Sequence, residues 1–309
     1  MRKVQLGEET GLPGRCELGR PVTPYPGQMH VLVVGIANLQ TTLPVDGFPV
    51  EYEPVRYLPH KIRSTFGGVG LNQARQLAAL GDHVQLAAPI GTDATGTALI
   101  QDLKAAGIDG TQSVRTLEQT PRSVILVEPS GRRAIFTDLG GALDHRFEPA
   151  NIEQAIRASD AVVLANLDFS RPLLPVASSH RRPVAVDLQV LRDPDDAYHQ
   201  DFLAADLLSL SHEGLGDASP GGVLRALRAR SAARLVVITL GADGCLAAGD
   251  GLDATHIPAQ RVPGDTAGAG DCFFASLVHY LLGQQCSPET ALAQASAATE
   301  AMLRQRPAV

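Results

Sequence analysis

The chain has 309 residues, 44% of them hydrophobic, and a formal net charge of −7. This length can bury a large core, in one large α/β domain or two small ones. The sequence has no apolar run long enough to cross a bilayer, no signal-peptide pattern and no dense Lys/Arg tract, which argues against membrane-spanning, secreted and general nucleic-acid-binding proteins. We therefore expect a cytoplasmic protein without a membrane or nucleic-acid partner.

Residues 1–28 are rich in Gly and Pro and show no periodic apolar pattern. Such a composition predicts a flexible leader rather than a structural element. The folded domain is therefore expected to span 29–309.

Short apolar runs rich in β-branched residues recur along this domain without polar alternation, which is typical of strands buried on both faces. Apolar residues at helical spacing lie between these runs, and Gly81 and Gly107 end two of the helical patterns. The alternation predicts a mostly parallel sheet covered by helices on both faces. The predicted strands lie at 31–34, 84–88, 161–165, 184–186 and 235–239.

Two stretches, 51–66 and 121–137, break this alternation. The second reads as a hairpin that turns at Pro129-Ser130-Gly131, with Arg132 and Arg133 solvated at its tip. Strands that do not belong to the parallel sheet need a separate layer, and a small layer leaves one apolar face over. The candidates for that face are Val124, Leu126 and Ile135.

An exposed apolar face with free strand edges is usually covered. A second copy of the same layer would cover it in a two-fold homodimer, which an Ile135→Glu variant would disrupt. The alternative is a monomer whose layer folds down on its own domain.

The segment Gly268-Ala269-Gly270 directly precedes Asp271 and an apolar helical run. A helix that opens on small residues leaves backbone N–H groups free, and these form an anion site at the positive end of the helix dipole. Asp271 beside such a site suits a general base in phosphoryl transfer from a nucleotide to an alcohol. The structural alternative is an ordinary loop with Asp271 as a helix cap.

Two known nucleotide motifs are missing. The sequence has no Gly-x-x-x-x-Gly-Lys-Ser/Thr, which excludes a P-loop kinase. Gly68 and Gly70 are not followed by a third Gly at dinucleotide-binding spacing, which argues against an NAD site.

The string 265–271 resembles the C-terminal signature of the PfkB (ribokinase-like) family of sugar and nucleoside kinases. Gly67-Gly68 followed by Asn72 resembles the family's N-terminal signature, and the likeness covers about 29–300. The resemblance implies a three-layer α/β/α fold with a small β-lid, built here from about 51–66 and 121–137, over the acceptor. It also implies an ATP-dependent kinase that uses Mg²⁺, and K⁺ in some members, and that phosphorylates a primary hydroxyl.

The same resemblance implies roles for individual residues. Asp271 is expected to be the general base, with Gly268, Ala269 and Gly270 as the anion hole. Glu213 is expected to act on the metal through water, and Asp265 to belong to a monovalent-cation loop. The residues expected to bind the acceptor are Asn38, Gln40, Gly67, Gly68, Asn72 and Asp168. Those expected to face the nucleotide are Ser211, Thr239, Gly241 and Thr266.

The chain departs from the family pattern at several positions. Gln40 stands where ribokinases have Asp, and Val69 where ribokinases and phosphofructokinases have Lys. Both changes make the pocket less polar, which favours a nucleoside-like acceptor over free ribose or a fructose phosphate. Ser211-His212-Glu213 replaces the family's Asn-x-x-Glu, which leaves a catalytically impaired sugar- or nucleoside-binding protein of the same fold as the alternative.

Asp187 and the cysteines carry two further expectations. Asp187 ends a predicted buried strand, where it either faces a ligand crevice or caps the strand end. The four cysteines form no Cys-x-x-Cys pair and have no His at zinc-ligand spacing, so we expect free thiols.

Overall fold

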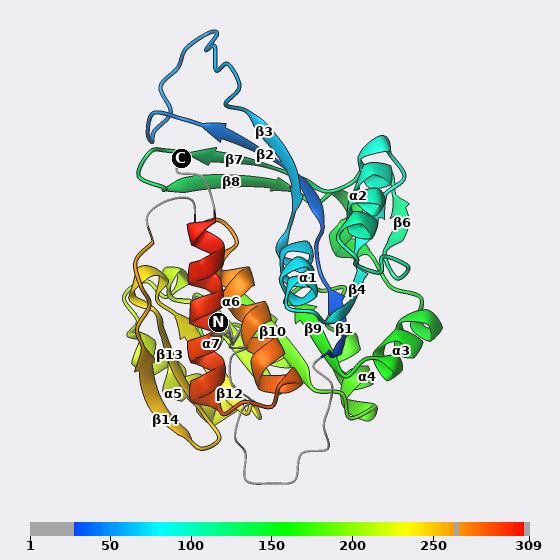
Figure 1. Cartoon of the computed structure of the whole chain (residues 1–309), viewed down its shortest axis with the longest axis vertical. Coiled ribbons are helices and arrows are strands. Elements are labelled where there is room, and N and C mark those ends of the chain that lie inside the picture. The colour runs from blue at the N-terminus through cyan, green and yellow to red at the C-terminus, as the bar shows by residue number, and fades with distance from the viewer. Residues whose placement is uncertain (1–27, 263–265, 306–309) are drawn as a thin grey trace, which may run out of the picture.

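The computed structural model describes residues 28–262 and 266–305. Its main sheet has eight strands in the order β14-β13-β12-β11-β10-β9-β1-β4 (Figure 1). The six strands from β12 to β4 are parallel, and β13 and β14 are antiparallel at one edge. The strands are β1 (His30–Val34), β4 (His83–Ala87), β9 (Ala161–Ala165), β10 (Val184–Val190), β11 (Leu207–Ser211), β12 (Leu235–Thr239), β13 (Cys245–Gly249) and β14 (Leu252–Ile257).

Helices cover both faces of this sheet because successive strand residues point to opposite sides. In β1, Val31 and Val33 pack in one hydrophobic cluster and Leu32 and Val34 in the other. The first cluster contains residues of α1 (Val69–Ala79), α2 (Ala94–Ala105), α6 (Ala269–Val278) and α7 (Pro288–Arg304). The second contains residues of α3 (Pro149–Ala158), α4 (Leu173–Ser179) and α5 (Pro220–Arg230). The predicted three-layer, mostly parallel α/β/α architecture is confirmed.

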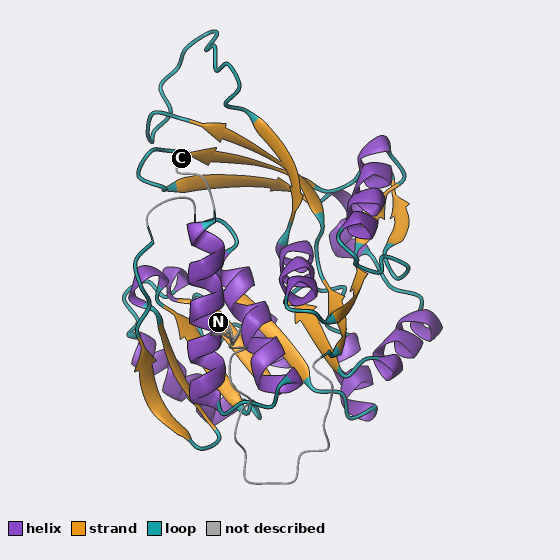
Figure 2. Cartoon of the chain, in the orientation of Figure 1, coloured by secondary structure: helices purple, strands orange, loops and turns teal. Residues whose placement is uncertain are grey.

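A four-stranded sheet forms a separate layer, the lid, beside the main sheet (Figure 2). Its order is β3-β2-β7-β8, and β7 and β8 form the predicted hairpin, with Gly131 in the turn at φ 87°. Its strands are β2 (Asn38–Pro44), β3 (Arg63–Gly67), β7 (Arg122–Val127) and β8 (Arg133–Asp138).

The lid differs from the sequence expectation in its first part. Within 51–66 only the end is a strand, because β3 begins at Arg63 and residues 51–62 have no regular strand or helix. The lid instead includes β2, which follows β1 after a short connection and pairs with both β3 and β7. The polar sequence of β2, NLQTTLP, lacks the apolar run by which the buried strands were recognised.

The remaining elements are short. A parallel pair, β5 (Pro89–Gly91) and β6 (Val114–Leu117), forms a third sheet. One-turn or slightly longer helical segments lie at Gly140–Asp144, Ala197–Ala204, His212–Gly214, Gly241–Asp243 and His279–Gly283, the last a π-helix. None of the helices in the described part of the chain is long and apolar enough to cross a membrane.

The cysteines follow the sequence expectation only in part. Cys245 and Cys272 are buried and are not disulfide-bonded. The expectation is wrong for Cys286, which is disulfide-bonded. Sequence spacing detects cysteines that are neighbours along the chain, and it cannot detect those that folding brings together. Of the expected leader at 1–28, residues 1–27 lie outside the described residues, as does Asp265.

Candidate active site

Two helices begin side by side at glycines near the carboxyl edge of the main sheet. Gly68 precedes α1 with φ 98° and Gly268 precedes α6 with φ 71°, and neither helix start has a side-chain cap. The Asn72 side chain in the first turn of α1 donates through Nδ2 to Oδ2 of Asp271 in the first turn of α6, at 2.7 Å. The two motifs, 199 residues apart in sequence, therefore meet where two positive helix ends converge.

The start of α6 leaves room and free donors for an anion. Ala269 N donates to Thr266 O at 3.1 Å, which closes the turn before the helix. The next two amides, of Gly270 and Asp271, have no intrahelical acceptor because they lie in the first turn. A Cβ added at Gly270 would meet nothing within 4 Å, so the space beside these amides is open.

Asp271 is a buried carboxyl with a raised pKa. Burial raises the pKa of Asp271 to about 6, while the hydrogen bond from Asn72 and the positive charge of Arg133 act in the opposite direction. A carboxylate with a pKa near 6 is ionised at neutral pH and is more basic than an ordinary aspartate.

Asp187 is a second carboxyl at this place. Ala185 in β10 packs in the same cluster as α1 and α6, so Asp187, two residues later, points to that same side. Burial and then the charge of Asp271 raise the pKa of Asp187 to about 7, although Gln189 N donates to its Oδ1 at 3.0 Å. The sequence left open whether Asp187 faces a ligand crevice or caps the strand end, and this placement fits the crevice.

The raised pKa values of both carboxyls affect stability. Both carboxyls, whose ordinary pKa is 3.8, stay protonated up to a higher pH in the folded protein than in the unfolded chain. The stability that the protonated forms contribute is therefore fully present below the ordinary pKa of 3.8, and it is lost as the pH rises from there through about 6 to 7. A cation bound near this pair would offset the loss.

The predicted acceptor-binding residues of β2 and the Gly-Gly motif lie together. Asn38 Nδ2 donates to Ser123 Oγ at 2.7 Å, and a Cβ on Gly68 would lie 3.2 Å from Asn38 Oδ1. A Cβ on Gly67 would lie 2.4 Å from Gln40 Oε1, so a side chain at this position would displace the Gln40 amide. Asn38 Oδ1 is buried and has no hydrogen-bond partner within 28–262 and 266–305, which is the state expected of an atom that accepts from a bound polar ligand.

Asp168 is placed differently from the other predicted acceptor residues. It is exposed after β9 and pairs with Arg171 at 3.2 Å. Arg171 also pairs with Asp201 at 2.8 Å and stacks on Tyr198. The charge of Asp168 is thus engaged within the protein, and its role in acceptor binding stays a prediction.

Three of the predicted nucleotide-facing residues, Ser211, Thr239 and Gly241, lie around His212 at the ends of β11 and β12, whereas Thr266 lies in the turn before α6. Ser211 and Thr239 are register partners, and Ser211 Oγ accepts from Glu213 N at 3.2 Å. His212 Nδ1 lies 2.9 Å from Thr239 O and must donate to it, because a carbonyl oxygen only accepts. A Cβ on Gly241 would lie 3.7 Å from the His212 ring. His212 therefore lies between Thr239 and Gly241 in this cluster.

The site has few carboxylates for a metal ion. Over the described residues there is no group of three His, Cys, Asp or Glu side chains that could hold one, and Glu213 is exposed. This donor set fits Mg²⁺, which keeps several waters and is held mainly by nucleotide phosphates with one or two carboxylates. Asp187, Asp271 and Glu213 are the acidic side chains that would face it. K⁺ binding through Asp265 stays a prediction.

Arg133 was missed by the sequence analysis as a site residue. It is half-buried at the tip of the β7–β8 hairpin, where it is the register partner of Val127. Its positive charge lowers the pKa of Asp271. The expectation of a solvated tip was wrong for this arginine because the lid brings the tip toward α6. The local sequence has no signal for that approach.

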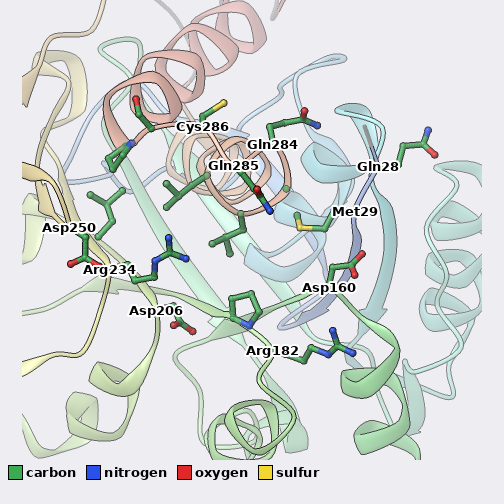
Figure 3. Close-up of a pocket in the computed structure, with 17 residues that line it drawn as sticks. Gln28, Met29, Asp160, Arg182, Asp206, Arg234, Asp250, Gln284, Gln285 and Cys286 are labelled. Atoms are coloured by element: carbon green, nitrogen blue, oxygen red, sulfur yellow. The ribbon is translucent and has the colours of Figure 1, made fainter. Parts of the chain in front are cut away.

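A cavity of about 690 Å³ lies elsewhere, at the amino ends of the main-sheet strands (Figure 3). Two of its carboxylates accept hydrogen bonds from the protein backbone: Asp160 from His30 N and Asp206 from Val184 N. Because the helix starts and Asp271 lie at the opposite edge of the sheet, this cavity is not the candidate active site.

The chain is similar in sequence and in fold to known sugar kinases. The chain is 26% identical over 282 residues to mouse ribokinase, covering 85% of each, and 26% identical over 270 residues to Staphylococcus aureus ribokinase, covering 81% of this chain and 86% of that one. Its fold matches a microbiome-derived acarbose kinase, Mak1, with a TM-score of 0.79 and 28% identity over 89% of this chain and 93% of the other. Arabidopsis thaliana ribokinase complexed with ribose and ATP matches with a TM-score of 0.73 and 21% identity, covering 91% and 94%.

The family model for pfkB family carbohydrate kinases matches residues 28–308. The chain belongs to the pfkB family of carbohydrate kinases and is an ATP-dependent phosphotransferase with a ribokinase-like fold.

Proposed function

We propose that this kinase transfers the γ-phosphoryl group of ATP to a primary hydroxyl of an uncharged sugar or nucleoside, with Asp271 as the general base. The observation that carries the proposal is the 2.7 Å bond from Asn72 to Asp271 at two adjacent glycine-started helices. It joins a base, a hydroxyl-binding amide and an anion site in one place.

The roles of the residues follow from this geometry. Asp271, ionised above pH 6, accepts the proton of the acceptor hydroxyl as its oxygen bonds to phosphorus. Asn72 orients the carboxylate, and the amides of Gly270 and Asp271 face the oxygens of the transferring group. Bound Mg²⁺ would neutralise charge on the nucleotide phosphates, and Arg133 adds positive charge from the lid.

The acceptor-facing side of the lid supports a neutral acceptor with an apolar part. Register partners share a face of a sheet, so Gln40, Ser123 and Thr137 lie on one side, together with Asn38. Ile135 lies on this same side, two residues from Thr137, and is 57% exposed. Neutral amides beside an exposed isoleucine suit a nucleoside better than free ribose or a sugar phosphate.

An acceptor screen tests the proposal. Thermal shift and ATP turnover are measured with adenosine, pseudouridine, ribose, fructose, fructose 6-phosphate and acarbose, the last because of the likeness to an acarbose kinase. We expect the highest kcat/KM on a nucleoside. Best turnover on fructose 6-phosphate would overturn the interpretation of Val69, and best turnover on ribose that of Gln40. Best turnover on acarbose would place the acceptor among oligosaccharides.

The altered Ser211-His212-Glu213 motif favours a second candidate, a sugar- or nucleoside-binding protein of the same fold with impaired catalysis. Exposure of Glu213 is consistent with a weakened metal site. Ligand-induced thermal shifts without ATP turnover on any shifting ligand would establish this candidate and reject the kinase proposal.

We further propose a homodimer through the outer face of the lid. Val124 and Phe136 are register partners on the side opposite Asn38 and are 43% and 60% exposed. A second lid would remove these apolar side chains from water. Ile135, a sequence candidate for this face, belongs to the opposite, acceptor-facing side, because neighbouring strand residues point to opposite sides.

Phe136→Glu is therefore expected to give a monomer, because a carboxylate cannot be buried without a partner. Ile135→Glu is the matched control, since it adds the same charge one residue away on the other face. Light scattering at micromolar concentration should report a dimer for wild type and Ile135→Glu and a mass near 32.5 kDa for Phe136→Glu. A monomeric wild type would refute the dimer.

A further inference from the structure

Helices α1 and α6 are joined by polar contacts that succeed one another along both helices. About one turn after the Asn72–Asp271 bond, towards the C-terminal ends of both helices, Gln76 Nε2 donates to Ser276 Oγ at 3.0 Å. Beyond the two helices, the Asp82 carboxylate accepts from His279 at 2.8 Å. Because residue numbers rise together on both sides, the two helices are parallel and both start at the candidate site.

The last contact fastens this helix pair to the main sheet. Asp82 and His279 are both buried, with side chains 0% and 6% exposed. The second oxygen of Asp82 accepts from the backbone N of Met29 at 3.1 Å, directly before β1. The pair is thus held at its far end by β1 and at its near end by the Asn72–Asp271 bond.

The rest of the α6 surface is apolar, so these polar contacts set the register. Every α6 residue from Cys272 to Val278 is buried, and Ser276 is fully buried among Phe273, Phe274 and Leu277. Apolar side chains tolerate small sliding of one helix along another, whereas a buried hydroxyl and an amide meet in one register only. A slip would leave Ser276 without its amide partner.

We propose that Gln76 and Ser276 are positioning residues for phosphoryl transfer, which hold the Asp271 carboxylate in the register where Asn72 donates to it. The inference rests on the proposed function, because it assigns Asp271 as the base. Neither Gln76 nor Ser276 touches the reacting atoms. They act one turn away from them, through the helices that carry Asn72 and Asp271.

The test compares Gln76→Leu, Ser276→Ala and the double variant with wild type. Each single variant should lower kcat by about tenfold, because a base displaced by a fraction of an ångström loses its alignment, and should leave the KM for ATP unchanged. The double variant should be no slower than the slower single variant, since both changes break the same contact. It leaves no buried group unpaired, so it is expected to fold even if a single variant does not.

Ser159→Ala is the control for loss of a buried hydroxyl. Ser159 Oγ donates to Ile156 O at 2.8 Å at the end of α3, on the other face of the sheet. It should lower the melting temperature as Ser276→Ala does and leave kcat unchanged. Equal kcat in wild type, Gln76→Leu, Ser276→Ala and the double variant would overturn the proposal. A loss in the double variant equal to the product of the two single losses would also overturn it.

A second measurement does not depend on turnover. The Asn72 hydrogen bond lowers the pKa of Asp271. Loss of the Gln76–Ser276 contact should weaken that hydrogen bond and so raise the pKa of Asp271 in the Gln76→Leu/Ser276→Ala protein. Carbon NMR titration of aspartate carboxyls, with the Asp271 signal assigned from Asp271→Asn, reports it directly. An unchanged pKa refutes the positioning role even if the wild type turns over no acceptor, and the latter result alone refutes only the proposed function.

Discussion

Asp271→Asn is expected to lower kcat by about 10²–10⁴-fold, the range that a positioned general base contributes. The amide has nearly the same shape and can still accept the hydrogen bond from Asn72, so the helix pair should remain in place. The affinity for ATP should therefore be close to that of wild type. Steady-state kinetics on the best acceptor and calorimetric titration with nucleotide test both parts, and near-normal turnover of the variant would reject Asp271 as the base.

The pH dependence of the wild type belongs to the same prediction. Because the pKa of Asp271 is raised to about 6, the active ionised form is lost below that pH rather than below the ordinary 3.8. We expect kcat/KM to fall about tenfold per pH unit below 6. A profile that stays flat to pH 4.5 would contradict an aspartate base in this environment.

Gly70→Ala is expected to damage both stability and activity. A Cβ at this position would lie 2.8 Å from the backbone Cα and C of Gly35 and 3.0 Å from Ile36 N. Backbone at the end of β1 cannot move aside as a flexible side chain can, so the start of α1 must shift. Overpacking of this kind costs about 1–3 kcal/mol. Because Asn72 lies two residues further on, displacement should also lower kcat/KM by about 10²-fold.

Gly141→Ala provides the matched control for this substitution. Gly141 is exposed, and a Cβ there would meet only Leu117 Cδ2 at an ordinary 3.6 Å. Thermal unfolding should show a melting temperature several degrees below wild type for Gly70→Ala and unchanged for Gly141→Ala. If the two variants behave alike, the close approach of α1 to β1 is not what holds Asn72.

The sequence by itself determined the architecture of the main domain. The apolar runs of β1, β4, β9, β10 and β12 are typical of strands buried on both faces, which requires helices on both sides. Local chemistry also predicts an anion site with a base at Gly268, Gly270 and Asp271, because a helix that starts on small residues leaves backbone amides free.

The lid shows where local pattern stops being sufficient. β2 is too polar to be read as a strand, and it is one because it pairs with β3 and β7. Ile135 was read as an outer residue, whereas its register with Ile125 sets its side of the sheet. A one-residue change in register reverses which side chains face the acceptor, and register is a property of the pairing, not of either strand.

Only the tertiary structure decided how the candidate active site is assembled. Asn72 and Asp271 lie 199 residues apart and meet because α1 and α6 pack in parallel in one register. Asp187 and Arg133 reach the same place from a strand end and from the lid. The charge of Arg133 lowers the pKa of Asp271, and the charge of Asp271 raises the pKa of Asp187. Periodicity specifies which face of each element is buried, but contacts between elements depend on the packing of the whole core, so no local stretch of sequence encodes them.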